Sequence, residues 1–412
     1  MPSRNSESPQ RGTETRFETR LYRRNRPVMH LLFEATRRLG PVVRIPRVGH
    51  VINDPDVARA ILLAPDAFNS HDHGSFGALI TEALGPDALI NMDGPAHQRF
   101  KRELLQVFSN RYIMQMIGDA AEPMIERLRL ALLTGEPVDF AAFMREYGCA
   151  VACALIGVAI APGDEQRAYD DIFWLATEIM AFAGSGRKTL RPQEKRVAQG
   201  YAKRLYAHIE ASYNADSGAN NSVTQRLRAQ GLDFDTVKDL VSVVLVGATE
   251  LVIYGLPRAL AVMVDSGAFA AVQNAPERLD DAIDEALRLT TPSNVILRAV
   301  SADRTILGHH FRKGDRALIA FRNIMRSTAY FEAPDRFDLD RVIPTEMKRL
   351  PFGAGLHTCL GTALTLAEMR QVLGALVALP GTLSISARSY NRGKLYPGYT
   401  QLLIGLDSTA AR

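Results

Sequence analysis

The chain has 412 residues, of which 47% are hydrophobic and 23% charged, a composition typical of a globular protein with a large core. Its formal charge of +4 is concentrated in residues 1–28, where seven arginines stand against three glutamates, so the remainder is close to neutral. This balance argues against nucleic acid as the main partner, and no uncharged run reaches the ~20 residues that a membrane-spanning helix needs.

The N-terminal residues and the cysteines indicate a soluble, cytoplasmic protein with a disordered tail. Residues 1–15 are rich in Ser, Pro, Arg and Glu and lack the apolar stretch of a secretory signal. Three cysteines fit a reducing compartment. Cys149 and Cys153 lie four apart on one face of an apolar helical stretch. A two-thiol metal site is conceivable there, but no further ligands are nearby, so core packing is the favoured interpretation.

From residue 40 onward the pattern predicts short strands followed by a series of helices. The predicted elements are strands at 40–45 and 48–52, a helix at 57–63, a long polar loop at 65–91, helices at 96–133, 140–160 and 164–183, a basic break at 184–195, helix to residue 212 and a loop at 216–221. Asp54 and the acidic turn after it mark the start of the first of these helices. Loops as long as 65–91 tend to be functional or mobile.

The longest predicted helix spans residues 236–265. We expect Asp235 to cap it, Ser266 and Gly267 to end it, and Pro257 to kink it. A further helix is predicted at 276–289, and short strands with turns at 295–337. Since neither a repeat nor a linker divides the chain, we predict a single domain over 16–412, mainly α-helical with small β-sheets (α+β).

The segment from Leu350 to Gly361 carries the strongest chemical signal. Gly353 and Gly355 relax the backbone, so it can fold over a flat object, and Cys359 precedes a helix-compatible run that starts at residue 362. A thiolate at a helix N-terminus gains from the helix dipole and from the free N–H groups there, which suits a ligand to iron. The alternative is a buried, inert cysteine after a glycine turn.

The run Phe-Gly-x-Gly-x-His-x-Cys-x-Gly, from Phe352 to Gly361, resembles the haem-binding loop of the cytochrome P450 family. The resemblance covers roughly residues 28–408. It implies the P450 fold with a long central helix, haem b (iron protoporphyrin IX) as cofactor, and Cys359 as the axial metal ligand. Phe352, His357 and Gly361 would be cofactor-binding residues of the same loop.

Two further segments resemble the family's Glu–Arg–Arg cluster behind the haem. Glu285 and Arg288 lie three apart on one helical face, and the segment Ala-Pro-Asp-Arg-Phe places Arg336 as the second arginine. Two guanidinium groups can share one carboxylate and so fix irregular loops. Alone, a Glu-x-x-Arg pair would be read as an exposed helix pair of little energetic weight.

The resemblance also implies cations for the haem propionates. His97 and Lys101, four apart, match a helical His and Arg, with lysine keeping the charge but losing the two-pronged geometry of arginine. Arg298 matches a second propionate-binding arginine, and His357 a third contact.

The long helix departs from the family pattern at the expected oxygen site. The chain reads Gly247-Ala248-Thr249-Glu250-Leu251, so the small pair and the acid are kept, but leucine replaces the usual threonine. Thr249 lies ~160° round the helix from position 251 and does not obviously replace that hydroxyl. The proton needed for oxygen chemistry could then come from the substrate or from water held by Glu250.

The resemblance implies a haem-thiolate monooxygenase that activates dioxygen to oxidise a small organic substrate in secondary metabolism, most simply by hydroxylation. Electrons would come from a ferredoxin and its reductase, with no nucleic acid or membrane partner, and we expect a monomer. Candidate ferredoxin-docking cations are Arg102, Lys348 and Arg349, although an ordinary solvated face is equally in keeping with them.

Substrate contacts are expected from five segments, at residues 69–91, 179–188, 243–251, 293–296 and 396–399. The alternatives are a haem-thiolate enzyme of non-hydroxylating chemistry (oxidative coupling, nitration, dehydration or peroxide-driven oxidation), which Leu251 keeps open, and a non-catalytic haem sensor or carrier.

Overall fold

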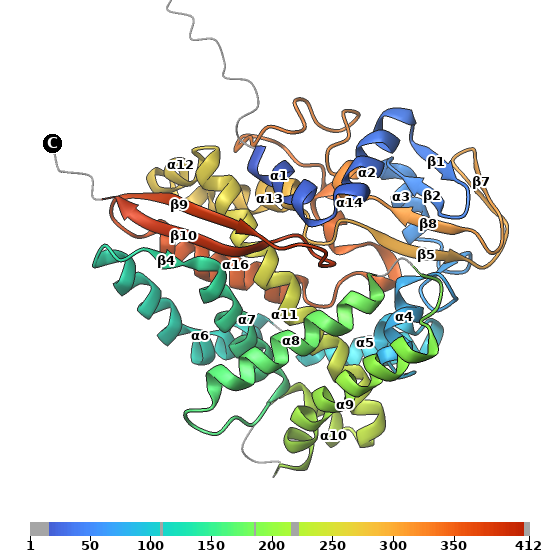
Figure 1. The fold of residues 1–412 in the computed structure, drawn as a ribbon, viewed down its shortest axis with the longest axis horizontal. Coiled ribbons are helices and arrows are strands. Elements are labelled where there is room, and N and C mark those ends of the chain that lie inside the picture. Colours follow the sequence, from blue (N-terminus) through green and yellow to red (C-terminus); the bar gives the residue numbers. More distant parts are fainter. Residues whose placement is uncertain (1–15, 108–109, 185–186, 216–221, 408–412) are drawn as a thin grey trace, which may run out of the picture.

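A computed structural model describes residues 16–107, 110–184, 187–215 and 222–407. The predicted tail at 1–15 and the predicted loop at 216–221 lie outside these residues. Figure 1 shows a mainly helical body with a β-region at one side, formed by the N-terminal strands and β5 and β8, and a long hairpin at the other, formed by β9 and β10.

The helices and strands agree in type with most of the sequence-based predictions. The α-helices are α1 (Arg16–Asn25), α2 (Pro27–Leu39), α3 (Pro55–Leu62), α4 (Phe76–Leu84), α5 (Gly94–Val107), α6 (Asn110–Leu133), α7 (Phe140–Ile156), α8 (Glu165–Ala183), α9 (Pro192–Asn214), α10 (Val223–Ala229), α11 (Phe234–Asp265), α12 (Ala268–Asn274), α13 (Leu279–Thr290), α14 (Phe321–Ile324), α15 (Thr345–Lys348) and α16 (Thr362–Val377). Short 3₁₀ turns are η1 (Leu89–Asn91), η2 (Pro276–Arg278), η3 (Leu350–Phe352) and η4 (Gly355–His357).

The strands of the described residues form small sheets. They are β1 (Val42–Ile45), β2 (Gly49–Ile52), β3 (Phe68–Asn69), β4 (Val138–Asp139), β5 (Ile296–Val300), β6 (Arg304–Ile306), β7 (His309–Phe311), β8 (Arg316–Ile319), β9 (Thr382–Tyr390) and β10 (Tyr399–Asp407). One sheet has the order β1-β2-β8-β5-β3, with β2 and β8 parallel and its other pairs antiparallel. The others are β4-β10-β9 and the pair β6-β7.

Helix α11 organises the helical body. Its 32 residues span ~48 Å at 1.5 Å per residue, and it contacts α7, α8, α9, α13 and α16. Figure 1 shows it running through the middle of the molecule. It is long and apolar enough to cross a membrane, but 72% of its most apolar window is buried inside the protein. The apolar residues of α11 are therefore explained by its burial in the core of the protein.

Two predictions about these elements are wrong. The segment 65–91, expected to be a polar loop, contains β3, α4 and η1, because Ser75 caps Ala78 N and because the apolar side chains of α4, among them Leu79 and Leu84, are buried. The cap of α11 is Asp233, whose side chain accepts a hydrogen bond from Thr236 N at 2.8 Å, and Asp235 lies in the first turn instead.

Candidate haem site

The cysteine loop folds back on itself ahead of α16. Cys359 N donates to Phe352 O at 2.8 Å, and Thr362 Oγ1 donates to Cys359 O at 3.0 Å. Gly353 (φ 81°) and Gly355 (φ 69°) take positive φ, and a Cβ on Gly355 would lie 2.8 Å from Leu62 O. Only glycine fits that approach without strain. Cys359 consequently lies just before the first turn of α16, as the sequence predicts.

The thiol of Cys359 has opposing electrostatic influences. Burial raises its pKa, while the Gly361 N–H, the Thr362 hydroxyl and the positive charge of Lys101 lower it. Burial dominates, so the pKa lies above the usual value. The helix terminus alone therefore does not make a thiolate here. A bound metal cation would supply the missing stabilisation, since coordination deprotonates a thiol outright.

A cluster of cationic and imidazole side chains lies beside this loop. The rings of His97 and His357 meet edge to face with centroids 4.7 Å apart. His357 Nε2 lies 2.7 Å from Asp93 Oδ1 and 3.2 Å from Ser70 Oγ. Lys101 Nζ donates to Leu356 O and Thr358 O at 2.5 and 3.0 Å. Sequence reasoning missed the partner role of Asp93 and Ser70, although Asp93 opens the segment that contains His97.

His97 and Arg298 are buried polar groups that form no ion pair with another described residue. Burial lowers the pKa of His97 to about 4, with His357 and Lys101 adding to the effect, and its Nδ1 is buried without a hydrogen-bond partner. Arg298 is 6% exposed, and its one hydrogen bond among the described residues goes to Leu297 O. Burial lowers its pKa to about 10, opposed by the charge of Asp93. Carboxylate groups such as haem propionates would satisfy both side chains.

The central helix carries an accessible strip within the core. Gly247 is exposed and has open space where a Cβ would stand, and Val244, Ala248 and Leu251 on the same face are half-buried, whereas Leu245, Val246 and Thr249 are buried. A flat cofactor with its edge groups on Arg298 and His97 would cover such a strip. The residues present therefore fit a haem, for which Cys359 would be the metal ligand.

The hydroxyl of Thr249 does not reach this strip. Its Oγ1 donates to Leu245 O at 2.6 Å within the same helix, and the residue is fully buried. The Thr249 hydroxyl is thus committed to the helix backbone rather than directed to this face. The accessible face of α11 from Val244 to Leu251 consequently presents no hydroxyl.

Glu250 lies on the flank of α11 beside α8. It is 2% exposed, and its Oε2 has no hydrogen-bond partner. Burial raises its pKa to about 8, opposed by Thr177 and Lys394. The carboxyl is accordingly protonated at neutral pH, and Glu250 can hold a proton one residue from Leu251.

The Glu–Arg–Arg cluster forms, but with a different second arginine. Glu285 accepts from Arg288 Nε at 2.6 Å and from Arg341 Nε at 3.0 Å, and all three side chains are buried. The prediction of Arg336 is wrong: its side chain is exposed, and its backbone carbonyl accepts from Arg288 and Arg341. The motif identified the correct segment of the chain, but a turn at 338–341 directs Arg341, rather than Arg336, toward Glu285.

Two of the five expected substrate-contact segments, 69–91 and 179–188, are in direct contact, and residues in or next to two others lie close by. Gly74 N donates to Lys188 O at 3.2 Å, and a Cβ on Gly184 would press on Leu395 at 2.9 Å. The ring of Tyr254, one turn after Glu250, lies so close to Gly398 that a Cβ there would clash at 2.3 Å. The α4 region, the end of α8, α11 and the turn before β10 are thus joined; residues 185–186 lie outside the described part.

The other two cysteines lie in the core, and the proposed docking cations are either paired with an acid or exposed. Cys149 and Cys153 are buried in α7 as part of the main hydrophobic core, which confirms core packing, and burial raises the pKa of both thiols. Lys348 and Arg349 both pair with Asp284, at 2.5 and 2.6 Å. Arg102 is exposed and donates to Gln98 O within α5.

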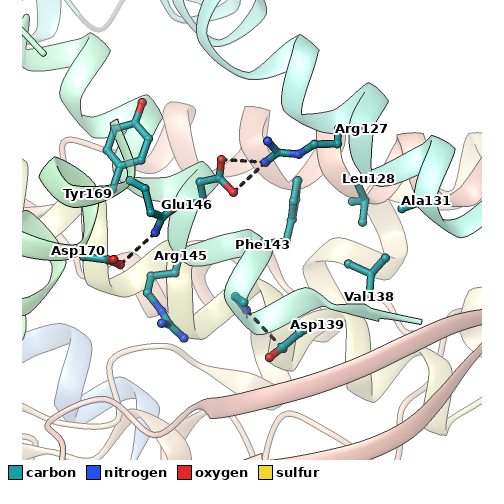
Figure 2. A pocket seen from close by; sticks show the side chains of 12 residues that line it. Arg127, Leu128, Ala131, Val138, Asp139, Phe143, Arg145, Glu146, Tyr169 and Asp170 are labelled. Atoms are coloured by element: carbon teal, nitrogen blue, oxygen red, sulfur yellow. Dashed lines mark hydrogen bonds and ion pairs between the residues drawn. The ribbon is translucent and has the colours of Figure 1, made fainter. Parts of the chain in front are cut away.

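A separate surface hollow of about 430 Å³ lies between α6, α7 and α8. Figure 2 shows Arg127 and Glu146 paired at its edge and Phe143 and Val138 on its apolar wall. Its lining contains none of the predicted site residues, so it is not the haem site.

Comparison with known proteins agrees with this arrangement. The family model described as Cytochrome P450 matches residues 273–378. A putative cytochrome P450, YjiB of Bacillus subtilis (strain 168), is 24% identical over 77% of this chain and 79% of its own length. The mycinamicin IV hydroxylase/epoxidase of Micromonospora griseorubida is 26% identical over 71% of this chain and 72% of its own. The crystal structure of ligand-free CYP164A2 from Mycobacterium smegmatis superposes with a TM-score of 0.75 at 25% identity, covering 94% of this chain and 98% of that one.

The fold and the thiol-and-cation site define a haem-thiolate protein. The chain belongs to the cytochrome P450 family. It is a haem-binding oxidoreductase of the monooxygenase type, with protoporphyrin IX haem as its cofactor.

Proposed function

We propose that the protein hydroxylates a small organic substrate of secondary metabolism, in the cytoplasm, with electrons from a ferredoxin and its reductase. The proposal rests chiefly on one observation: Cys359, at the head of α16, shares its loop with His357, whose ring meets that of buried His97, and the buried guanidinium of Arg298 has no carboxylate partner among the described residues. The hydroxylase of Micromonospora griseorubida, similar over 71% of this chain, supports the substrate class.

In this proposal each side chain has a defined role. Cys359 binds the iron, and Arg298, His97 and His357 bind the propionates, while Lys101 fixes the loop through Leu356 O and Thr358 O. When bound, the haem supplies the activation of dioxygen. The half-buried strip of α11 keeps the reacting face apolar and limits the water that reaches it.

Proton delivery is the step at which this chain differs from the family pattern. Leu251 offers no hydroxyl, and the hydroxyl of Thr249 is committed to Leu245 O. Glu250 carries a proton at neutral pH because burial raises its pKa to about 8. We therefore assign proton supply to Glu250 through water, or to a hydroxyl or amine of the substrate.

The second candidate is non-hydroxylating haem-thiolate chemistry, favoured by the same missing hydroxyl. Oxidative coupling removes hydrogen from the substrate and inserts no oxygen into the product. Turnover with isotopically labelled dioxygen separates the two, because hydroxylation places one labelled oxygen in the product and coupling places none. Unlabelled product from a turning-over enzyme would contradict the hydroxylation proposal.

A Leu251→Thr variant sharpens that test. If the substrate delivers its own proton, analogues without a donor group should gain product per reductant consumed, and the native substrate should gain little. If the enzyme couples radicals, the variant should divert part of the product toward oxygenated species. Identical products and ratios for both proteins would mean that position 251 does not lie at the oxygen site.

A further inference from the structure

Helix α2 presents an apolar stripe to solvent. Val28, Leu31 and Leu39 are 77%, 66% and 73% exposed, and Ala35 between them is exposed as well. At 100° per residue these four positions fall within a sector of about 80°, and they extend ~16 Å along the helix. The opposite face, with His30, Phe33 and Thr36, is buried. An amphipathic helix packed on a core usually has a polar outer face. Helix α2 instead has a second apolar face, which no described residue covers.

The exposed charges that α1 and α2 themselves carry are of one sign. The exposed charged side chains of α1 and α2 are all arginines: Arg16, Arg20, Arg23, Arg24 and Arg38. The two acids of these helices point into the protein, where Glu18 pairs with Arg258 and Glu34 with Arg322. Asp335, which contacts Arg37 at 3.6 Å, also pairs with Arg326 at 3.0 Å.

The neighbouring β1–β2 hairpin adds further apolar and arginine side chains to this face. Ile45 and Val48 pack against the small cluster that Met29 of α2 also contacts. In the same β1–β2 hairpin, Arg44 and Arg47 are exposed. Figure 1 shows α2 at the edge of the molecule near β1, with α1 beside it.

We propose that this face, formed by α1, α2 and the β1–β2 hairpin, docks the protein on the surface of an anionic membrane. Apolar side chains reach the acyl boundary while the flanking arginines meet lipid phosphates, which is how peripheral helices bind. The sequence-based expectation of no membrane partner rested on the lack of a spanning run. Surface docking needs no such run, and the stripe becomes visible only once the buried face of α2 is known.

Two other occupants fit the face less well. A second copy related by a two-fold axis would bring the same arginines opposite one another, where like charges repel. The stripe, ~16 Å by roughly one helix width, is also far smaller than the ~800 Å² that each partner of a stable protein complex buries. A membrane needs neither a pocket nor shape complementarity, only area and charge of the opposite sign.

The test is cosedimentation of the full-length holoprotein with vesicles. Vesicles of phosphatidylcholine with about 30% phosphatidylglycerol should bind the protein at low salt, and phosphatidylcholine alone should not. Raising the salt to about 0.5 M should release it, because screening shortens the reach of the arginine charges. Equal binding to both vesicle types, or no binding to either, would overturn the proposal.

Matched variants locate the binding on this face. Arg23→Gln with Arg24→Gln should weaken binding about 25-fold, at about five-fold per arginine. Val28→Ser, Leu31→Ser and Leu39→Ser together should weaken it at least ten-fold. The control, Leu307→Ser with Val342→Ser, removes side chains that are 64% and 88% exposed elsewhere and should bind as wild type. An unchanged haem spectrum verifies that each variant is folded.

Several outcomes would assign the face to another occupant. Sedimentation that shows a wild-type dimer abolished by Leu31→Ser, without vesicle binding, would make it an interface between copies. Loss of affinity for an acidic ferredoxin in the arginine variant, without vesicle binding, would assign it to that protein. Vesicle binding that both variants retain would place the membrane contact elsewhere in the chain. Each of these results overturns the proposal.

Discussion

The two sides of the candidate haem site are built differently. On the cysteine side, hydrogen bonds between residues a few positions apart shape one short segment, as in Cys359 N to Phe352 O at 2.8 Å. On the α11 side, side chains from distant elements meet, as in Glu250 beside Thr177 of α8 and Tyr254 against Gly398. The first side can be predicted from a local pattern, and it is also the side that keeps the family motif intact. The second side depends on tertiary packing, and there the motif departs at Leu251.

The largest effect should follow from replacing the metal ligand. Cys359→His should retain some haem but lose the red-shifted Soret band that the reduced carbon monoxide complex of a thiolate-ligated haem shows. The control replaces Cys149 and Cys153 with Ala, which should leave the band intact and cost a few kcal/mol of packing at most. Survival of the band in Cys359→His would refute the ligand assignment.

The Glu285 cluster should be next in effect, on folding rather than chemistry. Glu285→Ala leaves Arg288 buried without its partner, which costs about 3–5 kcal/mol, a large part of a domain's stability. We expect little folded holoprotein. Arg341→Ala should be intermediate, since it removes one contact to Glu285.

Arg336→Ala is the matched control for that series. Its side chain is exposed and only its backbone carbonyl takes part, so the free energy of unfolding measured with urea should stay within about 0.5 kcal/mol of wild type. Should Arg336→Ala destabilise the protein as much as Arg341→Ala, the assignment of the second arginine would be wrong.

Arg336 and Arg341 show which features of the structure could be predicted from the sequence and which could not. The helical body, the long central helix, the strands at 40–52 and the cysteine loop followed from periodicity, turn residues and motif. The choice of Arg341 over Arg336 did not, because it depends on how the turn at 338–341 folds, and Asp338 N itself donates to Glu285 at 3.0 Å. Helix α4 was missed because its polar, glycine-bearing surroundings hid the cap at Ser75. The partner of His357, Asp93, lies 264 positions away and could not be paired without the fold.

Substituting Arg298 tests whether this residue contributes to haem binding. A charge-assisted hydrogen bond is worth roughly 1.5–3 kcal/mol, so Arg298→Ala should lower haem affinity about ten- to a hundred-fold. Competition with apomyoglobin after dilution measures the loss. Arg298→Lys, which keeps the charge but not the two-pronged geometry, should recover part of it. Unchanged haem retention in Arg298→Ala would exclude this residue as a propionate partner.

The last effect concerns the α11 side and is spread over a range of pH. Burial raises the pKa of Glu250 to about 8, well above the ~4.3 of an exposed glutamate. Between these values the folded state binds a proton that the unfolded state releases, so stability is greatest at low pH and falls as pH rises toward 8. The loss is at most about 1.4 kcal/mol per pH unit for each such group. Glu368 in α16, whose pKa burial also raises to about 8, should contribute in the same direction.

Substituting one acid at a time separates the two sides of the site. Glu250→Gln and Glu368→Gln mimic the protonated acid, so each should flatten the decline in unfolding free energy between pH 5 and 8 by its own share. Glu250→Gln should in addition alter the pH profile of product formed per reductant, since it removes the proton that we assign to the reaction. Glu368→Gln, on a helix with no assigned role in proton transfer, should leave that profile unchanged. Parallel changes in both properties for both variants would mean that Glu250 acts only through stability, and proton supply would then fall to the substrate.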